Sequence, residues 1–325
     1  MRRFFPRISR AAVLGSLALC ALTSCAGDGA KDGAGSGAAV TSTQKGDPVS
    51  QHRLAMAYIG GVGVPQDDKE AVVWLRRAVD QGYYPANVTL GYMYENGRGV
   101  QRDYAEAIRL YRAAADRGDG DALGNLATMY AAGRGVGKDP AEAVRLSLAA
   151  AEKGNQRAQR MVGIFYLNGT GVAKNEAEGV RWIRRAADGG YALARTSLGE
   201  LYESGRGVAK DETEAARLFC QASEQGEPNG MFDLGRLYVI GKGIERDVPA
   251  GLRLLHLAAD GGSVAAKRIL GMLYDAGADG IPKDPAESAK WLRAAAESSD
   301  TTSAHPLAPP KEPFNCAKSL KKPLV

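Results

Sequence analysis

The sequence predicts an all-α protein built from seven consecutive repeats of 36 residues, each a pair of helices. Three columns of residues recur at this spacing. The first column is tyrosine, at Tyr58, Tyr94, Tyr130, Tyr166, Tyr202, Tyr238 and Tyr274. The second is glycine, at Gly61, Gly97, Gly133, Gly169, Gly205, Gly241 and Gly277. The third is aliphatic and lies four residues before each tyrosine, at Leu54, Leu90, Leu126, Val162, Leu198, Leu234 and Leu270. Because the three columns stay in register over seven copies, we interpret the chain as a repeat array.

The first helix of each repeat contains the aliphatic residue and the tyrosine. If the aliphatic residue is at position i, the residue before the tyrosine is at i+3 and the tyrosine is at i+4. These three positions share one face of a helix. The residue directly after the aliphatic one is alanine or glycine in every repeat, at Ala55, Gly91, Ala127, Gly163, Gly199, Gly235 and Gly271. A glycine inside a helix costs about 1 kcal/mol relative to alanine. Its recurrence therefore predicts that a second helix approaches closely at this column.

A Gly-x-Gly-Val segment, such as residues 97–100, is predicted to end the first helix, because glycine readily adopts a positive φ. The second helix is predicted to start three residues later, at an N-cap formed by Asp67, Asp103, Asp139, Asn175, Asp211, Asp247 or Asp284. Six repeats place a glutamate three residues after the cap, at Glu70, Glu106, Glu142, Glu178, Glu214 and Glu287. This spacing predicts a capping box.

The second helix repeats a pattern of alanine, a large apolar residue and alanine, as in Ala71, Trp74 and Ala78. It is predicted to end at a glycine, at Gly82, Gly118, Gly154, Gly190, Gly226 or Gly262. The seventh copy has one extra residue in its loop, residues 277–281, and Ser299 in place of the closing glycine. Such irregularities are expected of a terminal repeat.

The consensus A-x3-L-G-x2-Y-x2-G-x-G-V-x2-D-x3-A-x2-W-x3-A-A-x2-G resembles the Sel-1-like repeat, a relative of the tetratricopeptide repeat, over residues 47–300. This resemblance implies a right-handed α/α solenoid of antiparallel helix pairs, with the first helices lining a concave face. It also implies an adaptor, since known members mostly assemble membrane or envelope complexes.

Residues 1–24 are typical of a bacterial signal peptide. The basic start consists of Arg2, Arg3, Arg7 and Arg10. The apolar segment that follows, residues 11–21, is too short to span a bilayer. It leads into Leu22-Thr23-Ser24-Cys25, which resembles the lipobox of bacterial lipoproteins. The resemblance implies that Cys25 carries fatty acyl chains such as palmitate, begins the mature protein and anchors it, with Ala26 favouring the outer membrane. The alternative is an ordinary secretory signal in which Cys25 has no role.

Two segments flank the predicted repeats. After Cys25, residues 26–46 are rich in Gly, Ala, Ser and Thr and predict a flexible tether, with an end-to-end distance of about 25 Å. Residues 301–325 form a tail rich in Pro and Lys. Removal of the four signal arginines lowers the formal charge from +5 to +1. The basic composition therefore gives no reason to predict binding to nucleic acid.

The sequence gives little sign of catalysis. Its three histidines, His52, His256 and His305, lie far apart, and no His, Cys or Asp cluster has the spacing of metal ligands. Residues 319–322 match the Ser-x-x-Lys motif of penicillin-recognising proteins, but neither of its companion motifs is present, so we interpret the match as accidental. We predict no metal, no cofactor and no enzymatic activity.

Two cysteines remain in the mature repeats and tail, Cys220 and Cys316, and the predicted compartment is oxidising. Cys220 occupies a column that is mostly arginine, so we expect it to be partly accessible. Two hypotheses stay open. A disulfide between the two cysteines pins the tail onto repeats five to seven, or both are separate thiols.

A partner is expected on the first helices, at columns that the core pattern leaves variable. Aromatic, Met and Arg side chains are enriched at protein interfaces. The candidate residues are Tyr92, Arg160, Ile164, Phe232, Arg236, Arg268 and Met272. The alternative is that Ile164, Phe232 and Met272 only pack against the neighbouring repeat.

The sequence as a whole predicts a non-catalytic scaffold in the bacterial envelope, anchored by lipid and facing the periplasm. It would bind an envelope protein or peptide on the concave face. The alternative is an envelope enzyme, such as a β-lactamase-like hydrolase, or a glycan-binding module that acts on peptidoglycan. Such an enzyme needs a nucleophile or a carboxylate pair in a pocket.

Overall fold

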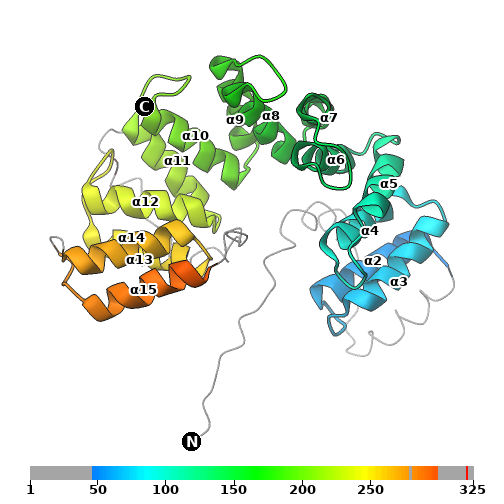
Figure 1. The fold of residues 1–325 in the computed structure, drawn as a ribbon, viewed down its shortest axis with the longest axis horizontal. Coiled ribbons are helices and arrows are strands. Elements are labelled where there is room, and N and C mark those ends of the chain that lie inside the picture. The colour runs from blue at the N-terminus through cyan, green and yellow to red at the C-terminus, as the bar shows by residue number, and fades with distance from the viewer. Residues whose placement is uncertain (1–45, 278–279, 299–319, 321–325) are drawn as a thin grey trace, which may run out of the picture. The chain divides into compact units, whose positions relative to one another are not determined.

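The computed structural model describes residues 46–277, 280–298 and 320 (Figure 1). These residues form fourteen α-helices, which alternate as the first and second helix of seven repeats. The first helices are α2 (Pro48–Gly60), α4 (Tyr84–Asn96), α6 (Gly120–Ala132), α8 (Gln156–Asn168), α10 (Ala192–Ser204), α12 (Pro228–Ile240) and α14 (Val264–Ala276). The second helices are α3 (Asp68–Asp80), α5 (Tyr104–Ala115), α7 (Pro140–Glu152), α9 (Glu176–Asp188), α11 (Glu212–Glu224), α13 (Val248–Asp260) and α15 (Pro285–Glu297). The predicted all-α array of seven helix pairs is confirmed.

The predicted signal peptide, Cys25 and most of the predicted tether lie outside the described residues, as does the tail apart from Leu320. Within the part of the chain that the structure describes, none of the helices combines the length and apolar character needed to cross a bilayer.

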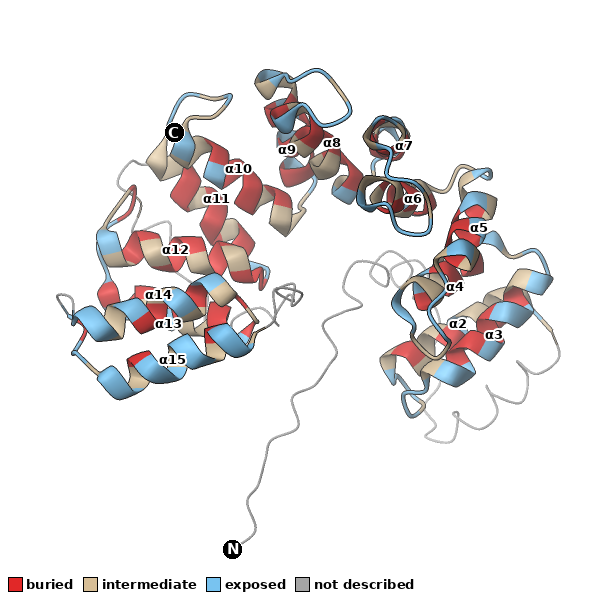
Figure 2. Cartoon of the chain, viewed as in Figure 1, coloured by how far each residue is buried: buried red, intermediate tan, exposed pale blue. Residues whose placement is uncertain are grey.

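The described helices belong to two compact units. The N-terminal unit contains residues 46–165 and 169–173, and the C-terminal unit contains residues 166–168, 174–277, 280–298 and 320. Within each unit, helices pack against their neighbours in chain order, for example α4 against α5 and α12 against α13. Buried residues follow the helices where they meet, and most loop residues are exposed (Figure 2).

Each unit has its own apolar core. In the N-terminal unit it includes Leu75, Met93 and Tyr111, all fully buried. In the C-terminal unit it includes Phe219 and Leu254. Met93 and Leu254 come from columns that the sequence predicted to face inward. Leu75, Tyr111 and Phe219 share a column, one residue after the Trp74 position, that the sequence pattern did not identify as core.

The small column of the first helix lies where a second helix approaches closely, as predicted. A Cβ atom added to Gly91 would lie 2.7 Å from the Tyr111 ring, and one added to Gly199 would lie 2.6 Å from the Phe219 ring. Both distances are shorter than any normal carbon–carbon contact. The absence of a side chain in this column therefore lets an aromatic residue of the second helix fill the space.

The two glycines of the Gly-x-Gly loop serve different purposes. Gly97 ends α4 with a φ of +65°, and its N–H donates to the Met93 carbonyl. Gly99 also has a φ of +65°, and a Cβ added there would lie 2.0 Å from the backbone oxygen of Asp68 in the preceding repeat. The second glycine therefore allows the loop to rest directly on the start of the preceding second helix, a contact that the sequence pattern did not predict.

All seven predicted N-caps are confirmed. In repeat two, the Asp103 carboxylate accepts hydrogen bonds from the N–H groups of Ala105 and Glu106, at 2.9 and 3.0 Å. The other capping side chains are Asp67, Asp139, Asn175, Asp211, Asp247 and Asp284.

The second half of the predicted capping box is wrong. The N–H of Asp103 donates to the carbonyl of Tyr94 at 3.0 Å, and the same bond to the repeat tyrosine forms in every repeat. Because this N–H already has an acceptor, the glutamate side chain does not need to return to it. Glu106 instead forms an ion pair with Arg109 at 2.7 Å. Equivalent pairs are Glu142–Arg145, Glu178–Arg181, Glu214–Arg217 and Glu287–Lys290.

The seventh repeat keeps the bond from the cap residue to the repeat tyrosine. The N–H of Asp284 donates to the Tyr274 carbonyl, at 2.8 Å, although the two residues are ten positions apart rather than nine. Gly280 has a φ of +82°, a positive value like that of the second loop glycine in the other repeats. Ser299, which replaces the closing glycine in this repeat, lies outside the described residues.

Candidate partner-binding face

We define the first-helix face by the column two residues before each repeat tyrosine. In the N-terminal unit this column carries no charge, with Met56, Tyr92, Thr128 and Ile164. Tyr92 is exposed, with 39% of its surface accessible. The other three are half-buried, as is the predicted site residue Arg160, one turn before Ile164 on α8. An aromatic side chain thus lies at the surface among uncharged residues of the same column.

The same column in the C-terminal unit carries charge, with Glu200, Arg236 and Met272. The Arg236 guanidinium donates to both oxygens of Glu203 on α10, with N–O distances of 3.0 and 2.6 Å. Phe232, one turn before Arg236, packs against the core cluster of this unit, as the alternative interpretation of the sequence held. Two of the predicted contact residues in this unit therefore take part in internal contacts.

The remaining predicted residues of the C-terminal unit, Arg268 and Met272, are exposed. Met272 has 54% of its surface accessible. Both lie on α14, which belongs to the last helix pair that the structure describes. Among the described residues, no further helix pair packs against the end of this one. Their exposure therefore follows in part from their position in the array.

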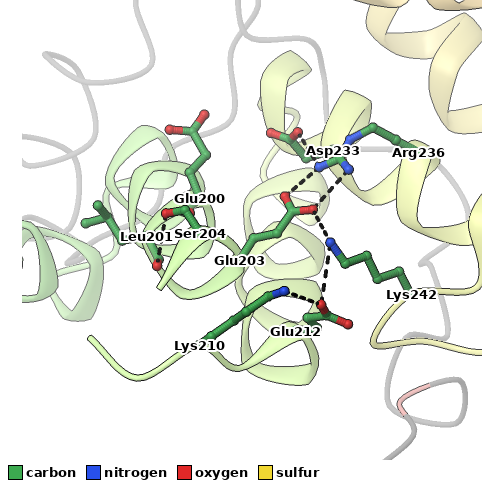
Figure 3. A network of polar contacts seen from close by, with 9 residues as sticks. All are labelled: Glu200, Leu201, Glu203, Ser204, Lys210, Glu212, Asp233, Arg236 and Lys242. Atoms are coloured by element: carbon green, nitrogen blue, oxygen red, sulfur yellow. Dashed lines mark hydrogen bonds and ion pairs between the residues drawn. The ribbon is translucent and has the colours of Figure 1, made fainter. Parts of the chain in front are cut away.

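A polar network joins α10, α11 and α12 (Figure 3). The Glu203 carboxylate accepts from Arg236 and from the Lys242 ammonium group, the latter at 3.3 Å. The Glu212 carboxylate lies 3.0 Å from the Lys210 ammonium and 3.5 Å from that of Lys242. Arg236, a charged residue of the first-helix face, is thus paired within the unit.

Asp233 on α12 is the most deeply buried carboxyl group of this network, with 7% of its surface accessible. Burial raises its pKa to about 7, and the negative charge of Glu200 adds to this effect, while Arg236 at 3.4 Å opposes it. Burial also acts to raise the pKa of Glu203, but the hydrogen bonds and positive charges of Arg236 and Lys242 outweigh it and hold that pKa below its usual value. Two neighbouring carboxyl groups thus titrate in different pH ranges.

Sequence reasoning missed Glu203, Asp233 and Lys242. A signal for the ion pairs exists in the repeat itself. The basic residue between the two loop glycines pairs with an acidic residue 30 positions earlier, at the start of the preceding second helix. The pairs are Arg98–Asp68, Arg206–Glu176 and Lys242–Glu212. Asp233 gives no such signal, because its column is not acidic in the other repeats.

The prediction that Cys220 is partly accessible is wrong, because it has only 4% of its surface exposed and lies in the core cluster of the C-terminal unit. Arginines in its column carry their charge outward to the tyrosine hydroxyl of the next repeat, as in Arg184–Tyr202 at 2.8 Å. A cysteine side chain is too short for this and has no charge to keep in water. Cys220 is disulfide-bonded. The three other cysteines lie outside the described residues, so its pairing with Cys316 stays a prediction.

The histidines form local contacts. His52 Nε2 lies 3.1 Å from the Thr89 hydroxyl and His256 Nε2 lies 3.1 Å from the Tyr274 hydroxyl, while His305 lies outside the described residues. Within the described ranges, His, Cys, Asp and Glu side chains form no group of three or more that could hold a metal ion. Two hollows of about 720 and 560 Å³ border loops at the helix ends, and both are open to solvent. Neither is lined by residues of the first-helix face.

Comparison with known proteins gives a family match along nearly the whole repeat region. The model of the Sel1 repeat matches residues 48–83, 86–119, 120–155, 156–191, 192–227, 228–263 and 264–300. The resemblance drawn from the sequence is thereby confirmed. A search of curated proteins found no match.

Several solved structures are similar to the chain. A protective antigen of uropathogenic Escherichia coli strains, c5321, is 32% identical over 82% of this chain, with a TM-score of 0.63. The chain spans 56% of the length of that protein. A Sel1 repeat protein from Oxalobacter formigenes is 28% identical over 78% of this chain and 98% of its own, with a TM-score of 0.67. The immunity protein PA5088 of Pseudomonas aeruginosa, at 21% identity over 66% of this chain and 80% of its own and a TM-score of 0.52, shares the fold.

Proposed function

The chain belongs to the Sel1 repeat family, whose members are generally non-catalytic protein-interaction scaffolds, and we propose that it holds a protein or peptide partner on the first-helix face of its N-terminal unit. We further propose that it does so in the bacterial envelope, attached to the outer membrane through an acylated Cys25 and facing the periplasm.

The observation that carries the choice of face is the exposure of Tyr92 in an uncharged column. A partner that covers Tyr92 would remove a large aromatic ring from water, beside Arg98, which is paired with Asp68. Aromatic residues at such positions contribute strongly to binding energy. In the C-terminal unit, by contrast, a partner would have to compete with Glu203 for Arg236. Replacing a well-formed charged pair brings little net gain in free energy.

The anchor is supported by sequence alone. The Leu22-Thr23-Ser24-Cys25 segment follows an apolar stretch that is too short to span a bilayer. Two or more acyl chains on Cys25 would bind the membrane stably, since each buried methylene contributes about 0.8 kcal/mol. Residues 26–46 would then separate the repeats from the membrane surface.

The face is tested by crosslinking in cells followed by pull-down through the protein, with Tyr92→Ala compared with Val73→Ala. Val73 is a matched control, because it is an apolar residue of the same unit that is 40% exposed, but on the second helix α3. We expect Tyr92→Ala to lose the partner about tenfold or more, as for a central aromatic contact, and Val73→Ala to retain it. Equal retention by both variants would refute the assignment of the face.

The anchor is tested separately, with Cys25→Ala. This variant should leave the membrane fraction while the repeats keep their helical circular dichroism spectrum. An unchanged membrane fraction would reject the lipid anchor without affecting the assignment of the face.

A further inference from the structure

The sixth repeat differs from the others at its surface. Its loop residue Ile244 is fully buried, as is Ile281 of repeat seven at 3% exposure, whereas the equivalent valines of repeats one to five are half-buried. Tyr238 is 4% exposed, although the tyrosines of this column are half-buried in the other six repeats. The burial of Tyr238 together with Ile244 is therefore particular to repeat six.

The amino-acid sequence departs from the repeat at the same place. Repeats one to five have valine in the Gly-x-Gly-Val loop, and repeats six and seven have isoleucine, Ile244 and Ile281. Val248 begins α13 in a column where the preceding five repeats have Asp, Tyr, Pro, Glu and Glu, and it is 7% exposed. Cys220 replaces the arginine found in most repeats. Val248 lies beside Gly280 of repeat seven. Cys220, Tyr238 and Ile244 belong to one core cluster, and we call these three residues the repeat-six seat.

Leu320, from the C-terminal tail, lies on this seat. It forms an antiparallel β-bridge with Ile244 and packs against the core cluster that contains Cys220, Tyr238 and Ile244. A β-bridge pairs backbone groups of two chain segments, so the backbone of the repeat-six loop pairs with that of Leu320. The side chain of Leu320 adds apolar contact to this backbone pairing.

We propose that the repeat-six seat is a strand-accepting docking site whose occupant is the protein's own C-terminal segment around Leu320. The chemistry of the seat selects an extended segment with an aliphatic residue at the bridged position. An outside peptide of the same kind would have to displace Leu320 before it could bind. This inference is independent of the proposed partner face, which lies in the other unit.

The experiment is hydrogen exchange of the full-length chain under reducing conditions, so that no disulfide holds the tail. In Leu320→Asp, we expect exchange in residues 238–248 to become at least about tenfold faster, because the bridge and its apolar cover are lost. The control variant Ile240→Asp changes an apolar residue that is 53% exposed in the same repeat and should have no such effect. The equivalent segment of repeat two, residues 94–104, should also be unchanged.

A peptide added in trans distinguishes docking from general loss of stability. A synthetic peptide of residues 314–325 should restore protection of residues 238–248 in Leu320→Asp, and the same peptide with aspartate at position 320 should not. Leu320→Ala serves as a second variant if the aspartate unfolds the C-terminal unit. The proposal is overturned if exchange is unchanged in both variants, if both peptides restore protection equally, or if protection in the wild-type chain falls on dilution, which would make the occupant a second copy.

Discussion

The first-helix faces of the two units differ although the repeats beneath them are alike. In the N-terminal unit the column that contains Tyr92 is uncharged, and in the C-terminal unit it contains Glu200 and Arg236. Both units nevertheless use the same capped helices, glycine loops and small column. The comparison teaches that the repeat constrains only the residues that fold it. Glu95 and Arg134 of the N-terminal unit form an ion pair at the positions equivalent to Glu203 and Lys242. The difference between the units therefore lies in this column, which is uncharged in one unit and contains the paired Arg236 in the other.

The shared scaffold is tested by substituting the second loop glycine in each unit. A Cβ added to Gly99 or to Gly243 would lie 2.0 or 2.1 Å from a backbone atom of the preceding repeat. We expect Gly99→Ala and Gly243→Ala each to lower the free energy of unfolding of its own unit by about 3 kcal/mol. The positive φ strains an alanine, and its Cβ collides with the backbone of the preceding repeat. Gly63→Ala is the matched control, because Gly63 has a φ of +74° but no neighbouring atom within 4 Å, and it should cost about 1 kcal/mol.

The measurement is urea denaturation followed by tryptophan fluorescence. Trp74 reports on the N-terminal unit, and Trp182 and Trp291 report on the C-terminal unit. A large loss for one of the two glycines and none for the other would show that the units do not share their scaffold.

The polar network predicts that the C-terminal unit responds to pH near neutrality. Because the pKa of Asp233 is raised to about 7, the folded unit retains a proton that the unfolded chain releases from about pH 4 upward. The stability that this proton provides is present below about pH 4 and is lost as pH rises toward 7. We expect the C-terminal unit to be less stable at pH 8 than at pH 5, on the order of 2 kcal/mol.

Asp233→Asn should remove the loss of stability at pH 8, because the amide does not titrate. What remains should have the opposite sign, since burial lowers the pKa of His256 and its protonation destabilises the unit as pH falls. Urea midpoints at pH 5 and pH 8, measured in a Trp74→Phe background, isolate the C-terminal unit. Glu203 does not confuse the result, since its lowered pKa places its titration below this range. If the stability of Asp233→Asn depended on pH as strongly as that of the wild-type chain and in the same direction, Asp233 would not be the cause.

The helix caps should give smaller and equal effects in the two units. Asp103→Ala and Asp211→Ala each remove a side-chain acceptor from the start of a second helix, which should cost about 1 kcal/mol. Glu106→Gln and Glu214→Gln remove only an i,i+3 ion pair and should cost about 0.3 kcal/mol. Denaturation midpoints for the four variants would test this. If a glutamate variant lost as much free energy of unfolding as its cap variant, the glutamate would have to act as part of a capping box after all.

Most of the fold could be predicted from the sequence, because helix ends depend on local chemistry. The aspartate caps and the positive φ of Gly97 follow from single residues and their spacing. The capping box failed because the N–H of Asp103 bonds to Tyr94, nine residues earlier, which no local rule describes.

The site was harder to predict, since exposure depends on contacts between repeats. Phe232 and Tyr92 are both aromatic residues of the first helices, yet Phe232 packs against the core and Tyr92 is exposed. Cys220 was expected near the surface because its column is mostly arginine, and it is buried beneath a seat that Leu320 occupies. The contact of Leu320 with repeat six leaves no periodic signal in the sequence.

The most direct test of the account is site-specific photo-crosslinking in cells, with the photoreactive residue placed at position 92 or at position 272. The two positions are equivalent in the repeat, and both side chains are exposed. We predict a crosslinked adduct with another protein from position 92 and none from position 272. An adduct from position 272 alone, or equal yields from both positions, would contradict the claim that the N-terminal unit holds the partner.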